Sequence, residues 1–124
     1  MRALSLLSIL GSLTITGCGL AGPTCQSTCR KLYMENECNI MRAGFPAPDG
    51  QTELFEKCMG YCELALDNTG DLGDYDPYSR SGSTSSISLD NEMQAAAWMD
   101  CVDLQACDRL DTNTANGGYC QPVW

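Results

Sequence analysis

Two stretches decide the fold of this 124-residue chain: Cys25-Gln-Ser-Thr-Cys29 and Cys58-Met-Gly-Tyr-Cys62. In each stretch two cysteines stand four residues apart, so on a helix their side chains lie on one face, one turn apart. Two such helices that pack side by side can be joined by two disulfides. An antiparallel hairpin is the simpler arrangement, because a parallel pair needs a return crossover between the helices. We expect the antiparallel pairs, Cys25–Cys62 and Cys29–Cys58; the parallel alternative is Cys25–Cys58 and Cys29–Cys62.

Apolar residues recur at helical spacing around both cysteine pairs. The first predicted helix covers about residues 25–37 after a Thr24 cap, and the second covers about 53–67 after a Thr52 cap. Residues 42–51, which lie between them, contain two prolines and two glycines and predict a loop.

A third helix is predicted from about residue 89 or 90, with Ser88 or Asp90 as its cap, to about Leu110. We find no strand pattern of useful length, so the sequence predicts an all-α, disulfide-stapled three-helix domain. The expected buried residues are Cys25, Cys29, Leu32, Tyr33 and Asn36 in the first helix, Phe55, Cys58, Cys62, Ala65 and Leu66 in the second, and Met93, Ala97, Trp98, Cys101, Val102 and Leu104 in the third.

The first eighteen residues are organised like an export signal. Arg2 precedes a short apolar run, residues 3–10, which is too short for a membrane span of about 20 residues. The stretch Ile15-Thr16-Gly17-Cys18 resembles a bacterial lipobox. The resemblance implies that residues 1–17 are a signal peptide and that Cys18 is the lipidated first residue of the mature protein. Residues 18–23 would then be a lipidated tether, and residues 24–124 the cysteine-rich helical domain.

The cysteine count agrees with this leader. The chain has nine cysteines, and eight remain once Cys18 is assigned to the lipid. An even number after an export signal predicts four disulfides in an oxidising compartment. Cys101 and Cys107 lie on different faces of the expected third helix, so they should not pair with each other. Beyond the hairpin pairs we expect Cys107–Cys120, which closes a short loop, and Cys38–Cys101; other connectivities remain open.

The charge of the chain excludes several classes of function. The formal charge is −9, and loss of Arg2 with the leader leaves −10. An acidic domain without a basic patch does not favour nucleic acid as a partner, nor direct adsorption to an anionic bilayer. The chain has no histidine. It also lacks the HExxH, P-loop and Gly-x-Ser-x-Gly patterns, so we expect neither an enzyme nor a cofactor.

Paired cysteines also occur in redox and metal proteins. A thiol–disulfide oxidoreductase usually has Cys-x2-Cys at the start of a helix in an α/β fold, whereas these pairs are Cys-x3-Cys within helices. Zinc sites use cysteine thiolates and histidine imidazoles as ligands, but cysteine thiols in an oxidising compartment would be bridged. Structural disulfides are the expectation, with no metal site.

Residues 68–88 are rich in glycine, serine, aspartate and proline and predict a long, flexible surface loop. Tyr75 and Tyr78 lie in this loop and are possible interface residues, although a spacer with incidental tyrosines is the simpler interpretation. An acidic run suggests calcium as an alternative, but its spacing does not fit an EF-hand, and a solvated loop is the default. The run consists of Asp67, Asp71, Asp74 and Asp76.

Together these features predict a membrane-anchored, extracytoplasmic lipoprotein of the bacterial envelope with a structural or interaction role. The doubly bridged hairpin resembles those of small secreted peptides and intermembrane-space proteins, which informs the fold and not the activity. The resemblance to lipoproteins also implies the outer membrane, because Gly19 stands where an inner-membrane protein carries aspartate. The expected partners are the membrane, through the lipid, and an envelope or surface protein. The alternatives are a freely secreted, cysteine-rich effector-like protein and a thiol-redox or metal-binding envelope protein.

Overall fold

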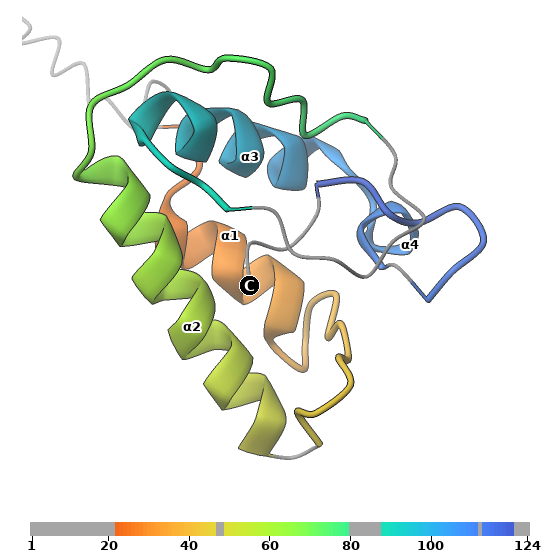
Figure 1. Ribbon diagram of the computed structural model, residues 1–124. Coiled ribbons are helices and arrows are strands. Elements are labelled where there is room, and N and C mark those ends of the chain that lie inside the picture. Colours follow the sequence, from red (N-terminus) through yellow and green to blue (C-terminus); the bar gives the residue numbers. More distant parts are fainter. Residues whose placement is uncertain (1–21, 47–48, 80–87, 112, 121–124) are drawn as a thin grey trace, which may run out of the picture.

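The computed structural model describes residues 22–46, 49–79, 88–111 and 113–120, and these residues form helices and connecting segments without a strand. The helices are α1 (Cys25–Tyr33), α2 (Asp49–Leu66), α3 (Glu92–Leu104) and the short α4 (Cys107–Leu110). Each of the three longer helices contacts the other two, and α4 follows at the end of α3 (Figure 1). The predicted all-α, three-helix fold is therefore confirmed, and Cys18, the expected lipidation site, lies outside the described residues.

Helix α1 starts where the sequence predicts but ends four residues early. Thr24 accepts a hydrogen bond from the Ser27 amide and donates its own amide to the Ser27 hydroxyl, a reciprocal cap. At the other end the Ile40 amide donates to the Leu32 carbonyl, so the chain turns back along the helix and buries Ile40. Because of this turn, Asn36 lies outside the helix and is exposed, contrary to expectation.

Helix α2 begins at Asp49, within the stretch that was predicted to be a loop. The Gly50 amide donates to the Pro46 carbonyl at 2.8 Å, which starts the helix early. A Cβ atom on Gly50 would lie 2.1 Å from the Phe45 carbonyl oxygen, so this glycine permits a close backbone approach rather than ending a helix. Gln51 is buried and donates to the Asn39 side-chain oxygen at 3.0 Å.

Helix α3 is shorter than predicted at both ends. Its cap is Asn91, whose side chain accepts hydrogen bonds from the amides of Met93 and Gln94 at 3.0 and 3.1 Å. The helix stops at Leu104, and Gln105 is extended. A separate turn of helix, α4, then starts at residue 107, so the expected continuous helix to residue 110 is wrong.

Lys31 of α1 explains how α3 can end inside the fold. Its ammonium group donates to the carbonyl oxygens of Val102, Asp103 and Gln105 at 2.6, 2.9 and 2.8 Å. Carbonyl groups at a helix end have no partner within the helix, and a cation there is also favoured by the helix dipole. Lys31 therefore fastens the end of α3 to α1.

The core lies between the three longer helices and includes three disulfides, Cys25–Cys62, Cys29–Cys58 and Cys101–Cys120. Trp98 is fully buried, as expected for a core residue. Met93 and Leu104 were expected in the core but are 50% and 71% exposed. The buried face of α3 is shifted from the predicted one because α3 packs against both α1 and α2. This face consists of Ala95, Trp98, Met99, Cys101 and Val102. In α2 the buried face includes Leu54, while Phe55 is half-buried and Leu66 is exposed.

Candidate functional site

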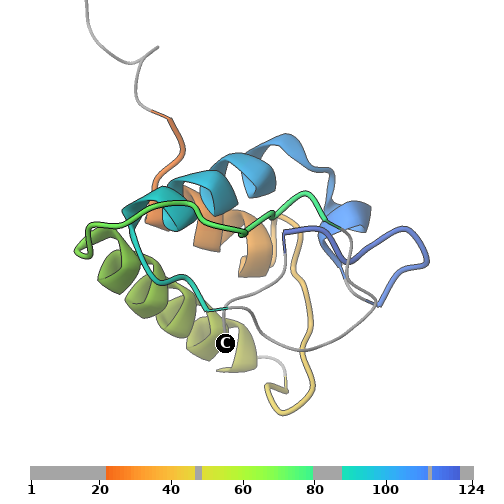
Figure 2. The same cartoon turned by 45° about the horizontal axis from the view of Figure 1, so that its top comes forward.

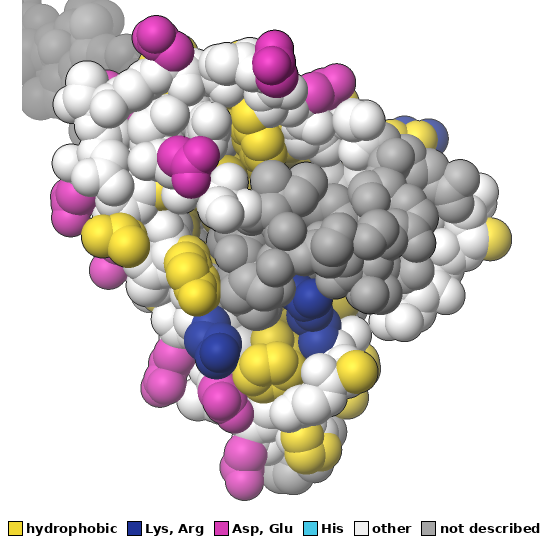
Figure 3. All heavy atoms as spheres, viewed as in Figure 1, with side chains coloured by type: hydrophobic (Ala, Val, Ile, Leu, Met, Phe, Trp, Pro, Cys, Tyr) yellow, Lys and Arg dark blue, Asp and Glu magenta, His cyan; other side chains and the backbone are white. Residues whose placement is uncertain are grey.

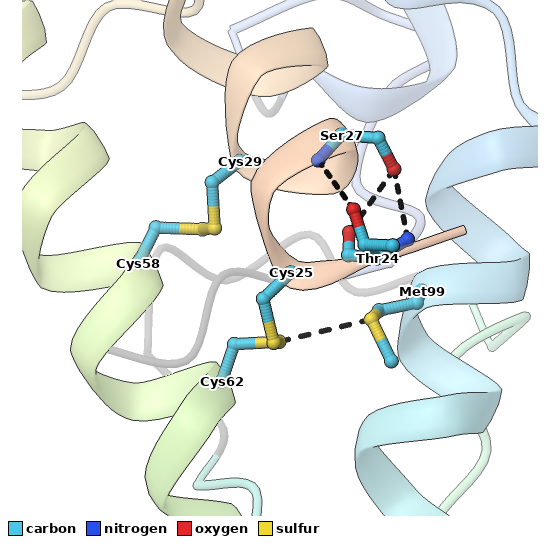
Figure 4. Close-up of a disulfide and its surroundings, with 7 residues drawn as sticks. All are labelled: Thr24, Cys25, Ser27, Cys29, Cys58, Cys62 and Met99. Atoms are coloured by element: carbon cyan, nitrogen blue, oxygen red, sulfur yellow. Dashed lines mark hydrogen bonds between the residues drawn. A yellow bond between two sulfur atoms is a disulfide. The ribbon is translucent and has the colours of Figure 1, made fainter. Parts of the chain in front are cut away.

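The two expected hairpin bridges are present side by side between α1 and α2 (Figure 4). Both have a Cα–Cα distance of 5.7 Å, as expected for cysteines on neighbouring turns of two packed helices. Helix α3 covers this pair, because the Met99 sulfur lies 3.8 Å from Cys62 Sγ. The antiparallel pairing Cys25–Cys62 and Cys29–Cys58 is thus confirmed.

The other two predicted pairings are wrong. The structure joins Cys38 to Cys107 and Cys101 to Cys120, where the sequence predicted Cys38–Cys101 and Cys107–Cys120. The reason is the end of α3 at Leu104. Cys107 starts a new helix and reaches the turn after α1, and Cys101 remains on the core face of α3.

The eight bridged cysteines differ in their exposure to solvent. Six of them are at most 6% exposed. Cys38 is half-buried and Cys107 is exposed. One disulfide among the described residues therefore lies at the surface, and the other three lie in the core.

The first part of the expected flexible loop is packed against the helices. Residues 68–79 run along α3 in both views of the chain (Figures 1 and 2). The Glu92 amide donates to the Asn68 carbonyl at 2.8 Å, and the Asn91 side chain donates to the Asp71 carbonyl at 2.9 Å. Most residues of this part are exposed, as expected of a solvated loop, but hydrogen bonds tie it to the start of α3; its flexibility stays a prediction, and residues 80–87 lie outside the described residues.

Pro77 anchors the end of this segment. It is buried, and its carbonyl oxygen accepts a hydrogen bond from the Cys120 amide at 2.9 Å. The same oxygen lies 3.3 Å from Cys101 Sγ, so residues 68–79 close over the Cys101–Cys120 bridge.

The two loop tyrosines have different environments. Tyr75 packs against the core, and its hydroxyl is buried without a hydrogen-bond partner among the described residues. Burial, and secondly the charge of Asp76, raise the pKa of Tyr75 well above its usual range. Tyr78 is 45% exposed. Of the two predicted interface residues, Tyr75 is part of the packing and Tyr78 alone is well exposed.

The acidic run does not form a metal site. Its four aspartates are all described and all exposed. Nowhere in the described part of the chain do three Asp, Glu, Cys or His side chains gather in a way that could hold a metal ion. The eight cysteines from 25 to 120 offer no thiolate ligands for zinc either, because all of them form disulfides.

The outer face of α2 carries an exposed apolar strip that the sequence analysis did not single out. Lys57, Gly60, Tyr61 and Leu64 line a shallow hollow of about 240 Å³, and we call these four residues the α2 strip. They stand at i, i+3, i+4 and i+7, so they follow one another along one side of the helix. Tyr61 is 45% and Leu64 is 62% exposed. Attention to the helix face beside the cysteines would have found them.

Gly60 is the one residue of the α2 strip that the fold does not explain. Glycine inside a helix destabilises it by about 1 kcal/mol relative to alanine. A Cβ atom on Gly60 would meet nothing within 4 Å among the described residues, in contrast to Gly50. The glycine therefore leaves the helix backbone open to close approach from outside.

Acidic side chains flank the α2 strip on one side. Figure 3 shows hydrophobic side chains exposed over α2 with acidic side chains along the outer edge of the helix. Lys57 is the basic residue of this helix, and its ammonium group lies 5.5 Å from the centre of the Phe45 ring. The exposed acidic residues of α2 are Asp49, Glu53, Glu56 and Glu63.

Known proteins offer no guide to the activity of the chain, since no protein family, no curated protein and no solved structure matches it. Within the described residues, no helix has both the length and the apolar character needed to cross a membrane. Four disulfides indicate an oxidising, extracytoplasmic location.

Proposed function

We propose that this protein is a lipid-anchored, extracytoplasmic interaction module that holds a partner protein at the bacterial envelope. The observation that carries the proposal is a small domain with four disulfides directly after a lipobox-like leader. A domain with this framework keeps its shape outside the cytoplasm with a core of limited size.

The distance from anchor to domain supports a role close to the membrane. Helix α1 begins at Cys25, seven residues after Cys18. Seven extended Cα–Cα steps span at most about 25 Å. A lipid on Cys18 would therefore hold the domain against the membrane surface, within reach of proteins embedded there.

The α2 strip is the contact surface in this proposal, and its chemistry suggests the kind of partner. Tyr61 and Leu64 offer an apolar face at helical spacing, which suits a second helix lying along the shallow hollow of the α2 strip. Acidic side chains flank one side of the strip, and the mature chain is strongly acidic. The partner we propose is an amphipathic helix with apolar anchors and basic flanks, which complements both features.

Metabolic labelling with palmitate tests the anchor. We expect the wild-type protein to carry label and the Cys18→Ala variant to carry none. In parallel, residues 1–18 are replaced by a cleavable leader without a lipobox, and this form should leave the membrane fraction. Absence of label in the wild type, or label that persists in Cys18→Ala, contradicts the anchor and favours the freely secreted alternative.

Binding of designed helical peptides tests the α2 strip. We expect the purified domain to bind a leucine-faced peptide with lysine flanks more tightly than the same peptide with glutamate flanks. Leu64→Asp should weaken binding at least tenfold. Leu104→Asp is the matched control, since Leu104 is an equally accessible leucine on α3. Equal binding of both peptides, or equal loss in both variants, contradicts the proposed surface.

A further inference from the structure

The surface disulfide is also the one that connects the two halves of the bridged framework. Two bridges lie wholly within residues 25–62, the hairpin half. Cys101–Cys120 lies wholly within residues 101–120, the C-terminal half. Among the bridges of the described residues, Cys38–Cys107 alone joins these halves.

Access to solvent singles out the same bond. Thiol–disulfide exchange requires a thiolate to reach one sulfur atom of the bond, so its rate depends on access. Cys107 is exposed, while the six cysteines of the other bridges are at most 6% exposed. A reductant can therefore reach the Cys38–Cys107 bond in the folded protein, and the other three bonds only after the fold opens.

We propose that Cys38–Cys107 is a thiol–disulfide exchange site, at which an extracytoplasmic dithiol protein unfastens the C-terminal half from the hairpin half. In this reaction the protein is the substrate of a redox partner, not itself an oxidoreductase. The other three bridges stay closed, so the change is local.

The exchange is balanced in two steps. A thiolate of the dithiol partner attacks Sγ of Cys107, the exposed cysteine of the bridge, and a mixed disulfide forms as the bond to Cys38 breaks and Cys38 leaves as a thiolate. The second thiol of the partner, as its thiolate, then attacks the partner's own sulfur in the mixed disulfide and releases Cys107. The bridge has gained two electrons, the partner has become a disulfide, and the two protons of the partner's thiols pass to the released cysteines.

Contacts that survive reduction limit the opening to the α4 region. Lys31 still holds the end of α3 through three carbonyl groups. Helix α4 itself is a single turn, held by the burial of Leu110 and by a bond of 3.4 Å from the Asn113 side chain to the Met41 carbonyl. We therefore expect reduction to release residues 106–119 and to leave α1, α2 and α3 packed.

Graded reduction followed by alkylation and peptide mapping tests the site. The folded protein is treated with rising concentrations of dithiothreitol, and in a second arm with a thioredoxin-fold reductase that carries a Cys-x2-Cys pair. We expect label on Cys38 and Cys107 at least tenfold faster than on the other six cysteines in both arms. Simultaneous labelling of all eight, or earlier labelling of another pair, overturns the proposal. Selective reduction by dithiothreitol alone shows an accessible bond that a protein cannot reach, which also overturns it.

A double variant provides the control for local opening. Cys38→Ser with Cys107→Ser should leave the remaining six cysteines unlabelled under the same conditions and keep the helical circular dichroism. Hydrogen exchange in residues 106–119 should rise to the level of the selectively reduced wild type, while exchange in α1 and α2 is unchanged. If α1 and α2 also lose protection in either form, the bond is part of the structural framework and not a separate exchange site.

Discussion

The hairpin half and the C-terminal half are both bridged, but by different structural means. In the hairpin half, two disulfides join two long helices at the same Cα–Cα distance, and all four cysteines are buried. In the C-terminal half, Cys101 pairs with Cys120, which lies in an irregular segment at a positive φ of 49°. Helical periodicity determines the first pattern, whereas the points at which helices end determine the second. Covalent bonds of one kind can thus be strongly or weakly specified by local sequence.

Removal of a hairpin bridge should cause the largest loss of stability in either half. Cys29→Ala with Cys58→Ala should lower the free energy of unfolding by about 2–5 kcal/mol, because a closed loop and two buried side chains are lost together. Urea denaturation measures the change. Cys101→Ala with Cys120→Ala is the matched pair, with a smaller closed loop and equal burial, and should rank second. A loss below 1 kcal/mol for the hairpin pair contradicts the view that this half depends on its bridges.

Lys31 connects the two halves without a covalent bond, and its removal should have the next largest effect. Lys31→Met keeps the apolar stem but leaves three carbonyl groups at the end of α3 without their donor. We expect a loss of about 1–3 kcal/mol in thermal or urea unfolding. Arg30→Met is the control, since the neighbouring Arg30 is exposed, and it should change stability by about 0.5 kcal/mol or less. Equal losses in both variants would show that general charge, not this contact, matters.

Two glycines of α2 should respond in opposite directions to the same substitution. Gly50→Ala should destabilise the domain by about 1–3 kcal/mol, because its Cβ would clash with the Phe45 backbone. Gly60→Ala should stabilise it by about 0.5–1 kcal/mol, because the added methyl group meets open space. If Gly60→Ala also weakens binding of the lysine-flanked peptide, the glycine serves the α2 strip. Loss of stability in Gly60→Ala would mean that the fold itself needs this glycine.

Tyr75 should give the smallest effect, at the border between the loop and the core. Tyr75→Phe removes a buried hydroxyl without a partner among the described residues, so stability at neutral pH should stay equal or rise by about 0.5 kcal/mol.

The pH dependence of the same variant sharpens this prediction. Burial holds the folded-state pKa of Tyr75 above that of the unfolded chain. The free energy of unfolding is therefore fully retained below about pH 10 and falls as the pH rises further, because the unfolded chain loses this proton more readily. Wild type should therefore lose more stability than Tyr75→Phe in alkaline urea titrations. Identical alkaline profiles would place the hydroxyl in solvent.

Local sequence was sufficient for the fold and for half of the bridges. The four-residue cysteine spacing places both sulfurs of each pair on one helical face, so the hairpin pairing follows from geometry within each helix. Thr24 was also identified correctly as a cap, because its hydrogen bonds reach only as far as Ser27. Such features depend on residues a few positions apart.

The features that the sequence analysis missed depend on distant residues. The end of α3 depends on Lys31, which is more than seventy positions away. The pairing of Cys107 with Cys38 depends in turn on where α3 ends. Gly50 is an exception in distance, since Phe45 is only five positions away, but the turn that brings the two together cannot be inferred from composition. Tyr75 looked exposed because the surrounding residues are polar, yet its ring packs against the core.

The first bridge also determines how the domain would carry mechanical force. A pull on the chain before Thr24 enters at Cys25, the first residue of α1, and passes through one covalent bond to Cys62. Cys62 is the neighbour of Tyr61 and lies two positions before Leu64, in the helix that bears the α2 strip. In the proposed function, load between an N-terminal tether and a partner on α2 would therefore bypass most of the hydrogen bonds of the fold. The contact with the partner, and not the bridged pair of helices, would then be the element that gives way first.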